Sequence, residues 1–366
     1  MTKKTKHIVI TVVMATFFLG LSVFAWIKPM DEFSVSERRK LSQFPHLSFN
    51  TVLSGDFMKN FENYTLDQFP LRDKFRTLKA LVALNVFNQS ANNDIYIVDG
   101  YASKIEYPLK EDSVKRAAQR FQYVYEKYLK DKNTKNYISI IPDKNYFLAE
   151  ENGYLSLDYE KMISVLRENT DFLQYIDITK DVERQDFYKT DTHWKQENLV
   201  DLAEKIGEEM GTDVKTEYDV KILDKDFYGV YYGQSALPLE AEQIKYLVND
   251  TLENCKVFDY QNNKEISVYD MEKAYGKDPY EMFLGGPLSL VTIENENAKT
   301  DKELIIFRDS FGSSIAPLLV EGYQKITLVD IRYIHPNLLE NYIEFDSQDV
   351  LFMYSTSVLN NSETIK

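Results

Sequence analysis

Residues 303–319 read ELIIFRDSFGSSIAPLL, and the predicted fold follows mainly from these residues. The apolar run at 303–307 is typical of a buried strand, and the residues after Ser310 continue as a helix. In an open α/β sheet, ligands bind beyond the carboxyl ends of the strands, where a helix N-terminus offers N–H groups. Ser310 is therefore a candidate nucleophile, with the N–H groups of Ser310 or Phe311 as candidate oxyanion donors. An ordinary helix N-cap is the alternative, and this stretch alone favours the cap.

Four more apolar runs have the character of buried strands, and amphipathic stretches separate them. The further predicted strands are 136–141, 173–178, 325–331 and 350–354, and the predicted helices are 110–130, 158–169, 195–210 and 313–320. Strands that alternate with helices of this length are typical of βαβ units. The sequence therefore predicts an α/β fold with a mostly parallel sheet.

A second candidate motif, TDTHW at 190–194, lies just before one of the predicted helices. A serine nucleophile needs a base, and histidine has an unperturbed pKa near neutrality. Residues two apart in an extended chain point the same way, so Asp191 is placed to orient the ring of His193. Trp194 is expected to form a wall of the site. The alternative is a structural histidine that is bonded to Asp191 at a helix start.

The chain has only four histidines, and their positions favour His193 as the base. His7 lies in the N-terminal tail, and His46 lies in a region interrupted by prolines. His335 comes directly before Pro336 and is a less suitable candidate. An exported histidine catalyst is therefore expected to be His193.

Composition excludes several classes of protein. The 366 residues include 43 Lys and Arg against 58 Asp and Glu, and this net charge of -15 disfavours a nucleic-acid binder. The single cysteine, Cys255, cannot form an intramolecular disulfide or a cysteine-based zinc site. One histidine with carboxylates would hold Mg²⁺ or Mn²⁺ only weakly, so no metal site and no cofactor are expected.

Residues 8–27 read IVITVVMATFFLGLSVFAWI, twenty positions without a charge. A helix of this length spans about 30 Å, which matches the hydrocarbon core of a membrane. Three lysines precede the run and one follows it closely, so residues 1–7 are expected in the cytoplasm and the remaining chain outside. An uncleaved, single-pass signal anchor in the cell membrane is favoured. A cleaved signal peptide is the alternative, and a buried core helix is disfavoured at this length.

The exported part divides into regions of different character. Residues 28–90 form a helical segment, in which 71–87 carries an apolar stripe at three- and four-residue steps. Residues 91–355 form the α/β domain, and its tyrosine-rich stretch 214–290 is predicted to be an inserted β-rich flap that acts as a lid. Residues 356–366 are polar and are expected to fray.

Several motifs, taken together, resemble those of the bacterial DHHW protein family. They run in order along nearly the whole exported chain: SERRKLSQFP (36–45), SGDF (54–57), DQFPLRD (67–73), IPDKNYF (141–147), TDTHW (190–194), FRDSFG (307–312) and VDIRY (329–333). The chain is also similar to the SGNH-like sugar O-acetyltransferases of alginate modification, in which an Asp-x-His motif precedes the serine. This resemblance implies a three-layer α/β/α fold and matches Asp191, His193 and Ser310 to a catalytic triad. The chain departs from the pattern at Thr192, where the namesake motif has histidine, and at Arg308, where SGNH proteins usually have glycine.

The resemblance implies an exported enzyme that acetylates a cell-surface or secreted polysaccharide through an acetyl-serine. No pool of acetyl-CoA is expected outside the membrane, so it also implies a partner, a membrane-bound O-acyltransferase that delivers acetyl groups. Arg332, Trp194 and Arg308 are the candidate substrate-binding residues, with a structural ion pair as the alternative for Arg332. The alternative functions are a carbohydrate acetyl esterase and a non-catalytic glycan-binding or assembly protein.

Overall fold

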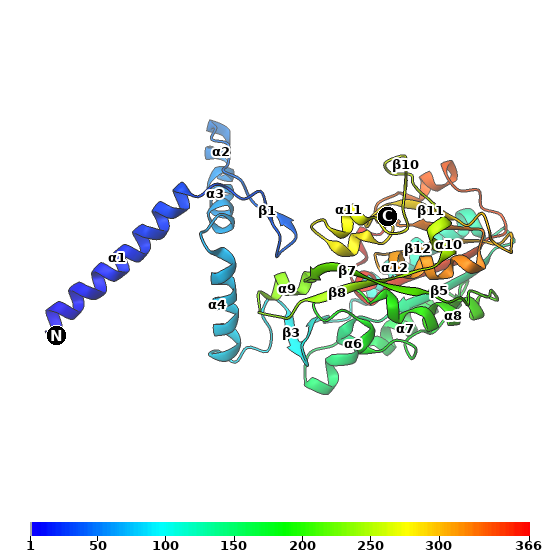
Figure 1. The fold of residues 1–366 in the computed structure, drawn as a ribbon, viewed down its shortest axis with the longest axis horizontal. Helices are drawn as coiled ribbons and strands as arrows, with labels where there is room; N and C mark the ends of the chain where they lie inside the picture. Colours follow the sequence, from blue (N-terminus) through cyan, green and yellow to red (C-terminus); the bar gives the residue numbers. More distant parts are fainter. Residues whose placement is uncertain (1) are drawn as a thin grey trace. The chain divides into compact units, whose positions relative to one another are not determined.

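A computed structural model describes residues 2–366 and divides the chain into two compact units (Figure 1). The N-terminal unit contains the chain up to Asn92 and also Tyr232–Pro238, whereas the sheet unit contains Asn93–Tyr231 and Leu239–Lys366. The short segment Tyr232–Pro238 lies far along the chain from the rest of the N-terminal unit. The regions predicted from the sequence are contiguous, so they do not include the joining of Tyr232–Pro238 to the N-terminal unit.

The sheet unit is built around one eight-stranded sheet. Its strands are Lys135–Ile141 (β5), Gln174–Tyr175 (β6), Lys256–Asp259 (β9), Lys264–Ile266 (β10), Leu290–Glu294 (β11), Glu303–Arg308 (β12), Lys325–Val329 (β13) and Asp349–Ser355 (β14). They lie in the order β10-β9-β11-β13-β12-β14-β5-β6. The pairs from β13 to β6 are parallel, and β11, β9 and β10 extend the sheet in antiparallel pairs. All five predicted strands lie in this sheet, which confirms the predicted mostly parallel α/β fold.

Alternation along the central strands gives the sheet two apolar faces. In β12, Leu304 and Ile306 belong to one buried cluster, whereas Ile305 and Phe307 belong to the other. Because side chains alternate along a strand, each cluster lies on its own face of the sheet. Both faces therefore need a cover of helices.

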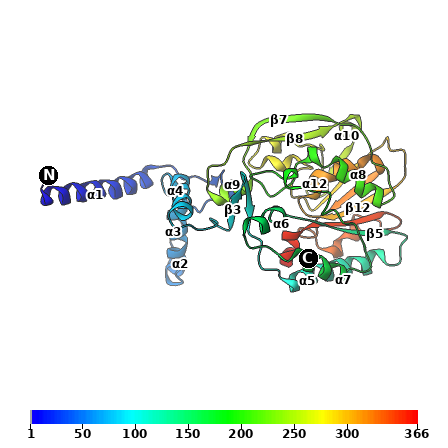
Figure 2. The same ribbon diagram turned by 90° about the horizontal axis from the view of Figure 1, so that it is seen from below.

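Helices cover both faces and complete three layers, as Figure 2 shows. Residues of Val200–Glu209 (α8) and Gly312–Ile315 (α12) join the first cluster, and residues of Glu111–Val124 (α5) and Tyr159–Glu168 (α7) join the second. The helix predicted at 313–320 is only partly α-helical. A 3₁₀ helix follows α12, since Pro317 has no N–H to donate within the turn. The other short elements are Ile95–Val98 (β3), Tyr101–Lys104 (β4), Lys144–Leu148 (α6), Val230–Ser235 (α9), Asp250–Asn254 (α10) and Met271–Ala274 (α11).

The predicted flap at 214–290 is only partly a separate element. Strands Asp219–Phe227 (β7) and Glu242–Val248 (β8) pair with each other outside the main sheet. The turn at 261–264, however, lies between β9 and β10, which both belong to the main sheet. The prediction is therefore wrong for the second half of the stretch, where the alternating apolar residues belong to strands at one side of the sheet.

The last residues of the chain are packed, so the prediction of a frayed tail at 356–366 is wrong. Thr356–Asn360 forms a short helix (α13), and the side chains of Leu359 and Ile365 are each only 1% exposed. The Ser362 hydroxyl also donates to the carbonyl of Ser113 at 2.7 Å. The segment has only three apolar residues, Val358, Leu359 and Ile365, which are too few to show a helix or strand period, so the sequence pattern gave no sign of this packing.

The N-terminal unit begins with Lys3–Ile27 (α1), a helix of 25 residues. None of the residues in its most apolar window is buried, and its length and composition are sufficient to cross a membrane. A membrane anchor and a signal sequence both have this form.

A short hairpin and three helices follow α1 in the N-terminal unit. They are Phe33–Ser34 (β1), Arg39–Lys40 (β2), Phe49–Leu53 (α2), Asp56–Asp67 (α3) and Arg72–Asn85 (α4). The helix predicted at 71–87 corresponds to α4. The sequence analysis does not predict α2 and α3 as separate helices.

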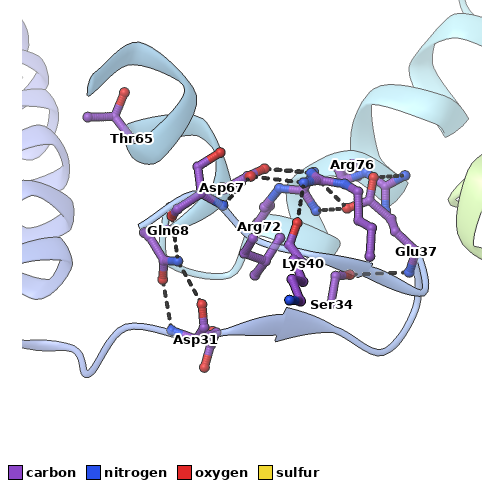
Figure 3. Close-up of polar contacts among 12 residues, drawn as sticks. Asp31, Ser34, Glu37, Lys40, Thr65, Asp67, Gln68, Arg72 and Arg76 are labelled. Atoms are coloured by element: carbon purple, nitrogen blue, oxygen red, sulfur yellow. Dashed lines mark hydrogen bonds and ion pairs between the residues drawn. The ribbon is translucent and has the colours of Figure 1, made fainter. Parts of the chain in front are cut away.

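Ion pairs connect this hairpin to α3 and α4 (Figure 3). Arg39 donates to both carboxylate oxygens of Asp67, at 2.9 and 2.5 Å. Arg72 and Arg76 both pair with Glu37. The hydrogen bond from Arg39 is the main reason that the pKa of Asp67 lies well below its ordinary value. Two of the motifs on which the family resemblance rests thus form one polar network.

Candidate active site

The Asp–His pair lies in a hairpin-like loop. An isolated antiparallel bridge pairs Phe187 with Trp194, and Tyr188 N–H donates to the carbonyl of His193 at 3.0 Å. Within the loop, the N–H of His193 donates to Asp191 Oδ1 at 3.1 Å. These bonds hold the two side chains on one side of the loop.

Ser310 lies two residues after the end of β12, at the carboxyl edge of the parallel strands. Asp309 holds this turn, because its carboxylate accepts from Phe311 N–H at 3.0 Å. The same carboxylate accepts from the N–H and the hydroxyl of Ser355, at 2.8 and 2.7 Å. Ser355 ends the neighbouring strand β14, so Asp309 fixes the turn to the sheet.

The structure brings Ser310, His193 and Asp191 together in one chain of hydrogen bonds. His193 Nε2 lies 2.8 Å from Ser310 Oγ, and His193 Nδ1 lies 2.6 Å from Asp191 Oδ1. The Asp191 side chain is fully buried, and its Oδ2 accepts from Val230 N–H at 2.9 Å. Asp191 thereby fixes the imidazole with Nε2 facing the hydroxyl, which is the arrangement that a serine nucleophile requires.

Gly229 allows the chain to pass close to Asp191. A Cβ atom at Gly229 would lie 2.3 Å from the Asp191 Cα atom, a distance that no side chain can occupy. The N–H of Gly229 donates to Thr190 Oγ1 at 2.9 Å, next to the bond from Val230 to the carboxylate. Glycine at this position thus lets the N–H groups of Gly229 and Val230 both donate to side chains of the loop that contains Asp191.

The ring of Tyr280, a residue that sequence reasoning missed, stacks on the imidazole of His193. The ring centroids are 3.9 Å apart and the planes differ by 11°. The Tyr280 hydroxyl bonds with Ser314 Oγ at 2.8 Å, and burial raises the pKa of this phenol well above its ordinary value. A neutral aromatic face beside the imidazole stabilises its protonated form. The sequence offers no signal for this residue, because the chain contains 26 tyrosines.

Trp194 lies beneath the site instead of forming a wall that a substrate can touch. Its side chain is fully buried, and its indole N–H donates to the Phe311 carbonyl at 3.1 Å and to Ser314 Oγ at 2.8 Å. These bonds connect the loop of His193 to the helix that follows Ser310. The predicted substrate contact is therefore wrong for Trp194, which positions the two halves of the site.

The two arginines predicted to bind substrate are held by protein groups. Arg308 is fully buried and reaches the carbonyls of Leu288 and Asp309 at 3.4 Å, and it lies 3.8 Å from Asp330. Its prediction as a substrate contact is wrong, since no surface of its side chain is exposed. Arg332 donates twice to the carboxylate of Asp330, at 2.9 and 2.7 Å, which is the structural ion pair weighed as its alternative.

One of the two amides predicted as oxyanion donors is already occupied. The N–H of Phe311 donates to Asp309, as described above. The N–H of Ser310 has no acceptor among residues 2–366. Ser310 N–H is therefore the amide available to a developing oxyanion.

A buried lysine supports the loop of the Asp–His pair. Lys144 is 2% exposed, and its ammonium group donates to the carbonyls of Tyr188 and Lys189 at 2.8 and 3.1 Å. Its Nζ also lies 4.9 Å from the centre of the Tyr231 ring. Burial lowers the pKa of Lys144 to about 7, and the nearby charge of Asp191 opposes this shift. The IPDKNYF motif indicated this position in the sequence, but its spacing did not reveal the role.

The part of the chain that the structure describes offers no metal site near these residues. Across residues 2–366, no group of three or more His, Cys, Asp or Glu side chains could hold a metal ion. Both ring nitrogens of His193 are engaged, one with Asp191 and the other with Ser310. The imidazole is thus placed for proton transfer.

The chain matches no protein-family model and no curated protein, but it is similar to solved structures. One is a DHHW family protein from Eubacterium siraeum, with 21% identity and a TM-score of 0.60 over 75% of this chain and 95% of that chain. Another is PatB1 from Bacillus cereus with a sulfonyl adduct, with 18% identity and a TM-score of 0.58 over 72% of this chain and 95% of that chain. The O-acetyltransferase domain of AlgJ from Pseudomonas putida is more distant, with 10% identity and a TM-score of 0.43 over 73% of this chain and 92% of that chain.

The first two similarities concern the fold. Each covers more than 70% of this chain and 95% of the other chain, so most of this chain shares the architecture of the other. The resemblance that the motifs predict is thereby confirmed at this level. The chain shares its fold with a DHHW family protein and with PatB1.

Proposed function

We propose that this protein is an exported O-acetyltransferase that modifies a cell-surface or secreted polysaccharide. The hydrogen bonds from Ser310 through His193 to Asp191 carry the proposal. They combine a nucleophile, a base and an orienting acid at the carboxyl edge of a parallel sheet. The motifs that resemble alginate-type acetyltransferases support acetyl as the transferred group and a sugar hydroxyl as the acceptor.

In the first half of the reaction, Ser310 Oγ attacks the carbonyl carbon of an acetyl ester or thioester. His193 Nε2 accepts the hydroxyl proton, and the charge of Asp191 stabilises the imidazolium. The N–H of Ser310 is placed to donate to the carbonyl oxygen as that oxygen gains charge. The donor alcohol or thiol leaves with the proton from His193, and an acetyl-serine remains.

In the second half, a sugar hydroxyl attacks the acetyl-serine. His193 removes the proton from this hydroxyl and returns a proton to Ser310 Oγ as the acyl bond breaks. The products are an O-acetylated sugar and the free serine. Water in place of the sugar would give acetate, which is the esterase reaction, so exclusion of water decides between the two outcomes.

We further infer that α1 anchors the protein in the cell membrane with its N-terminus in the cytoplasm. The uncharged run and the lysines before it support this topology. The acetyl group must then cross the membrane, and a membrane-bound O-acyltransferase is the partner that could deliver it. Anchoring would keep donor and acceptor enzymes at a high effective concentration.

Acetyl transfer by the purified full chain tests the proposal, with an aryl acetate as donor and an oligosaccharide as acceptor. Ser310→Ala should abolish both sugar acetylation and acetate release. Ser313→Ala is the matched control and should retain both, because Ser313 is buried and its hydroxyl has no partner in the described chain. Acetate release without acetylated sugar would indicate the esterase. Unchanged turnover in Ser310→Ala would remove Ser310 from the mechanism.

A further inference from the structure

Exposed apolar side chains gather on the N-terminal unit outside α1. Between residues 44 and 87, thirteen large hydrophobic side chains are exposed, and none is a tyrosine: Phe44, Leu47, Phe49, Val52, Leu53, Met58, Leu66, Phe69, Leu71, Leu78, Leu81, Val86 and Phe87. In the much longer sheet unit only twelve are exposed, and seven of these are tyrosines with a polar end. Exposed apolar side chains in this number are typical of an interaction site. We call it the 44–87 surface.

A groove joins the 44–87 surface to the apolar helix α1. Its volume is about 550 Å³, and its walls are mostly apolar. Helix α1 supplies one wall from Phe17 to Trp26, and Phe44 and Phe69 are among the residues of the other. If α1 crosses a membrane, side chains that share a groove with Phe17 to Trp26 lie in the outer half of the bilayer, between its acyl chains and its headgroups.

The charges of the chain also favour the N-terminal unit for contact with lipid. Residues 28–92 contain nine Lys and Arg against seven Asp and Glu, whereas the sheet unit contains 31 against 51. An anionic membrane surface repels the sheet unit but not the N-terminal unit.

Three lysines in the N-terminal unit are available to anionic headgroups. The network of Figure 3 engages Arg39, Arg72 and Arg76 with carboxylates. Lys40, Lys59 and Lys74 are exposed instead, and they pair with no carboxylate in the described part of the chain. A lysine beside an anionic surface is attracted to it. Both parts of a lipid-binding surface, apolar and basic, are thus present.

We propose that the 44–87 surface binds the lipid bilayer, with α2, α3 and α4 in the boundary between headgroups and acyl chains. This inference rests on the proposed anchoring of the chain by α1. The partner of the 44–87 surface is an anionic lipid surface, because its apolar side chains are aliphatic or phenylalanine and the net charge of residues 28–92 is not acidic. The hairpin and its ion pairs then hold these helices beside α1.

Tryptophan fluorescence of the full chain in vesicles tests this placement. The vesicles contain phosphatidylcholine and phosphatidylglycerol, with bromine on the acyl chains as the quencher. The chain carries Trp26→Phe, which leaves the buried Trp194 as background, and receives a single new probe. Phe49→Trp should lose most of its emission. Tyr275→Trp, on an exposed residue of the sheet unit, is the matched control and should lose none.

Further variants and a flotation measurement distinguish the possible outcomes. Phe87→Trp, at a second exposed position, should be quenched like Phe49→Trp. Lys59→Gln with Lys74→Gln should weaken the quenching in anionic vesicles and not in phosphatidylcholine alone. Flotation of the same vesicles reports anchoring, so a protein that fails to float contradicts α1 as an anchor. If the protein floats and neither Phe49→Trp nor Phe87→Trp is quenched, the proposal that the 44–87 surface binds lipid is wrong. It is also wrong if these two probes are quenched no more than Tyr275→Trp.

Discussion

Asp191 is the residue on which the proposed base depends most. Its carboxylate is fully buried and accepts from both His193 and Val230. Asp191→Asn keeps the shape but removes the charge that stabilises the imidazolium, so we expect kcat to fall by about 10³–10⁴-fold. Aryl acetate turnover measures the loss. Asp158→Asn, at the N-cap of α7, is the control and should retain its turnover; near-normal turnover in Asp191→Asn would exclude the proposed triad.

Lys144 makes stability depend on pH in a definite direction. Burial lowers its pKa to about 7 from an ordinary value of 10.5. Between these pH values the unfolded chain holds a proton that the folded chain has released, so stability rises with pH across this window. Lys144→Met should flatten the rise in Tm, as measured by thermal unfolding, whereas the exposed Lys130→Met should not. A rise as steep as that of the wild type would mean that Lys144 does not titrate in this range.

The sequence could identify Ser310 because it stands at a strand-to-helix junction, His193 because histidine is scarce, and Asp191 because it lies two positions before this histidine. The roles of Trp194 and Tyr280 could not be predicted in this way. Whether an aromatic ring faces a substrate, stacks on an imidazole or lies below a turn depends on packing between segments far apart in the chain. Residue spacing alone carries no information about that packing.

Among the elements, the turn before α9 has no room for a side chain at Gly229. Gly229→Ala would push a methyl group into the backbone of Asp191, where only 2.3 Å is available. A displacement of about 1 Å near a catalytic group can reduce turnover about 10²-fold, and we expect a loss of at least this size. Gly20→Ala, where the added methyl group has open space, is the control. Full turnover in a folded Gly229→Ala protein would show that the close approach does not hold the site.

The packed C-terminal segment should contribute to stability. Leu359 is buried against the core beneath the sheet, and Leu359→Ala should reduce the free energy of unfolding by about 2–5 kcal/mol. Val358→Ala, at a partly exposed neighbour, should cost less. Urea denaturation of the full chain measures both variants. Equal and small losses would indicate that the segment frays in solution, as its polar composition suggests.

In the molecule as a whole, the sequence predicts the apolar helix and the α/β domain but not the return of Tyr232–Pro238 to the N-terminal unit. Tyr232–Pro238 belongs to the N-terminal unit, where Arg76 donates to the Gly233 carbonyl at 2.7 Å and Asn92 to the Ser235 carbonyl at 2.8 Å. These bonds join residues more than 140 positions apart. Periodicity reports local structure, so it cannot show that a distant segment returns to an earlier unit.

Covalent labelling of the full chain by a sulfonyl fluoride, read by peptide mass spectrometry, tests whether Ser310 is an activated nucleophile. The hydroxyl of Ser310 should react because His193 Nε2 is placed to accept its proton. We expect the adduct on Ser310 in the wild type and in Ser313→Ala, a much smaller amount in His193→Gln, and none in Ser310→Ala. An adduct on a different residue, or equal labelling of the wild type and Ser310→Ala, would contradict the proposed nucleophile.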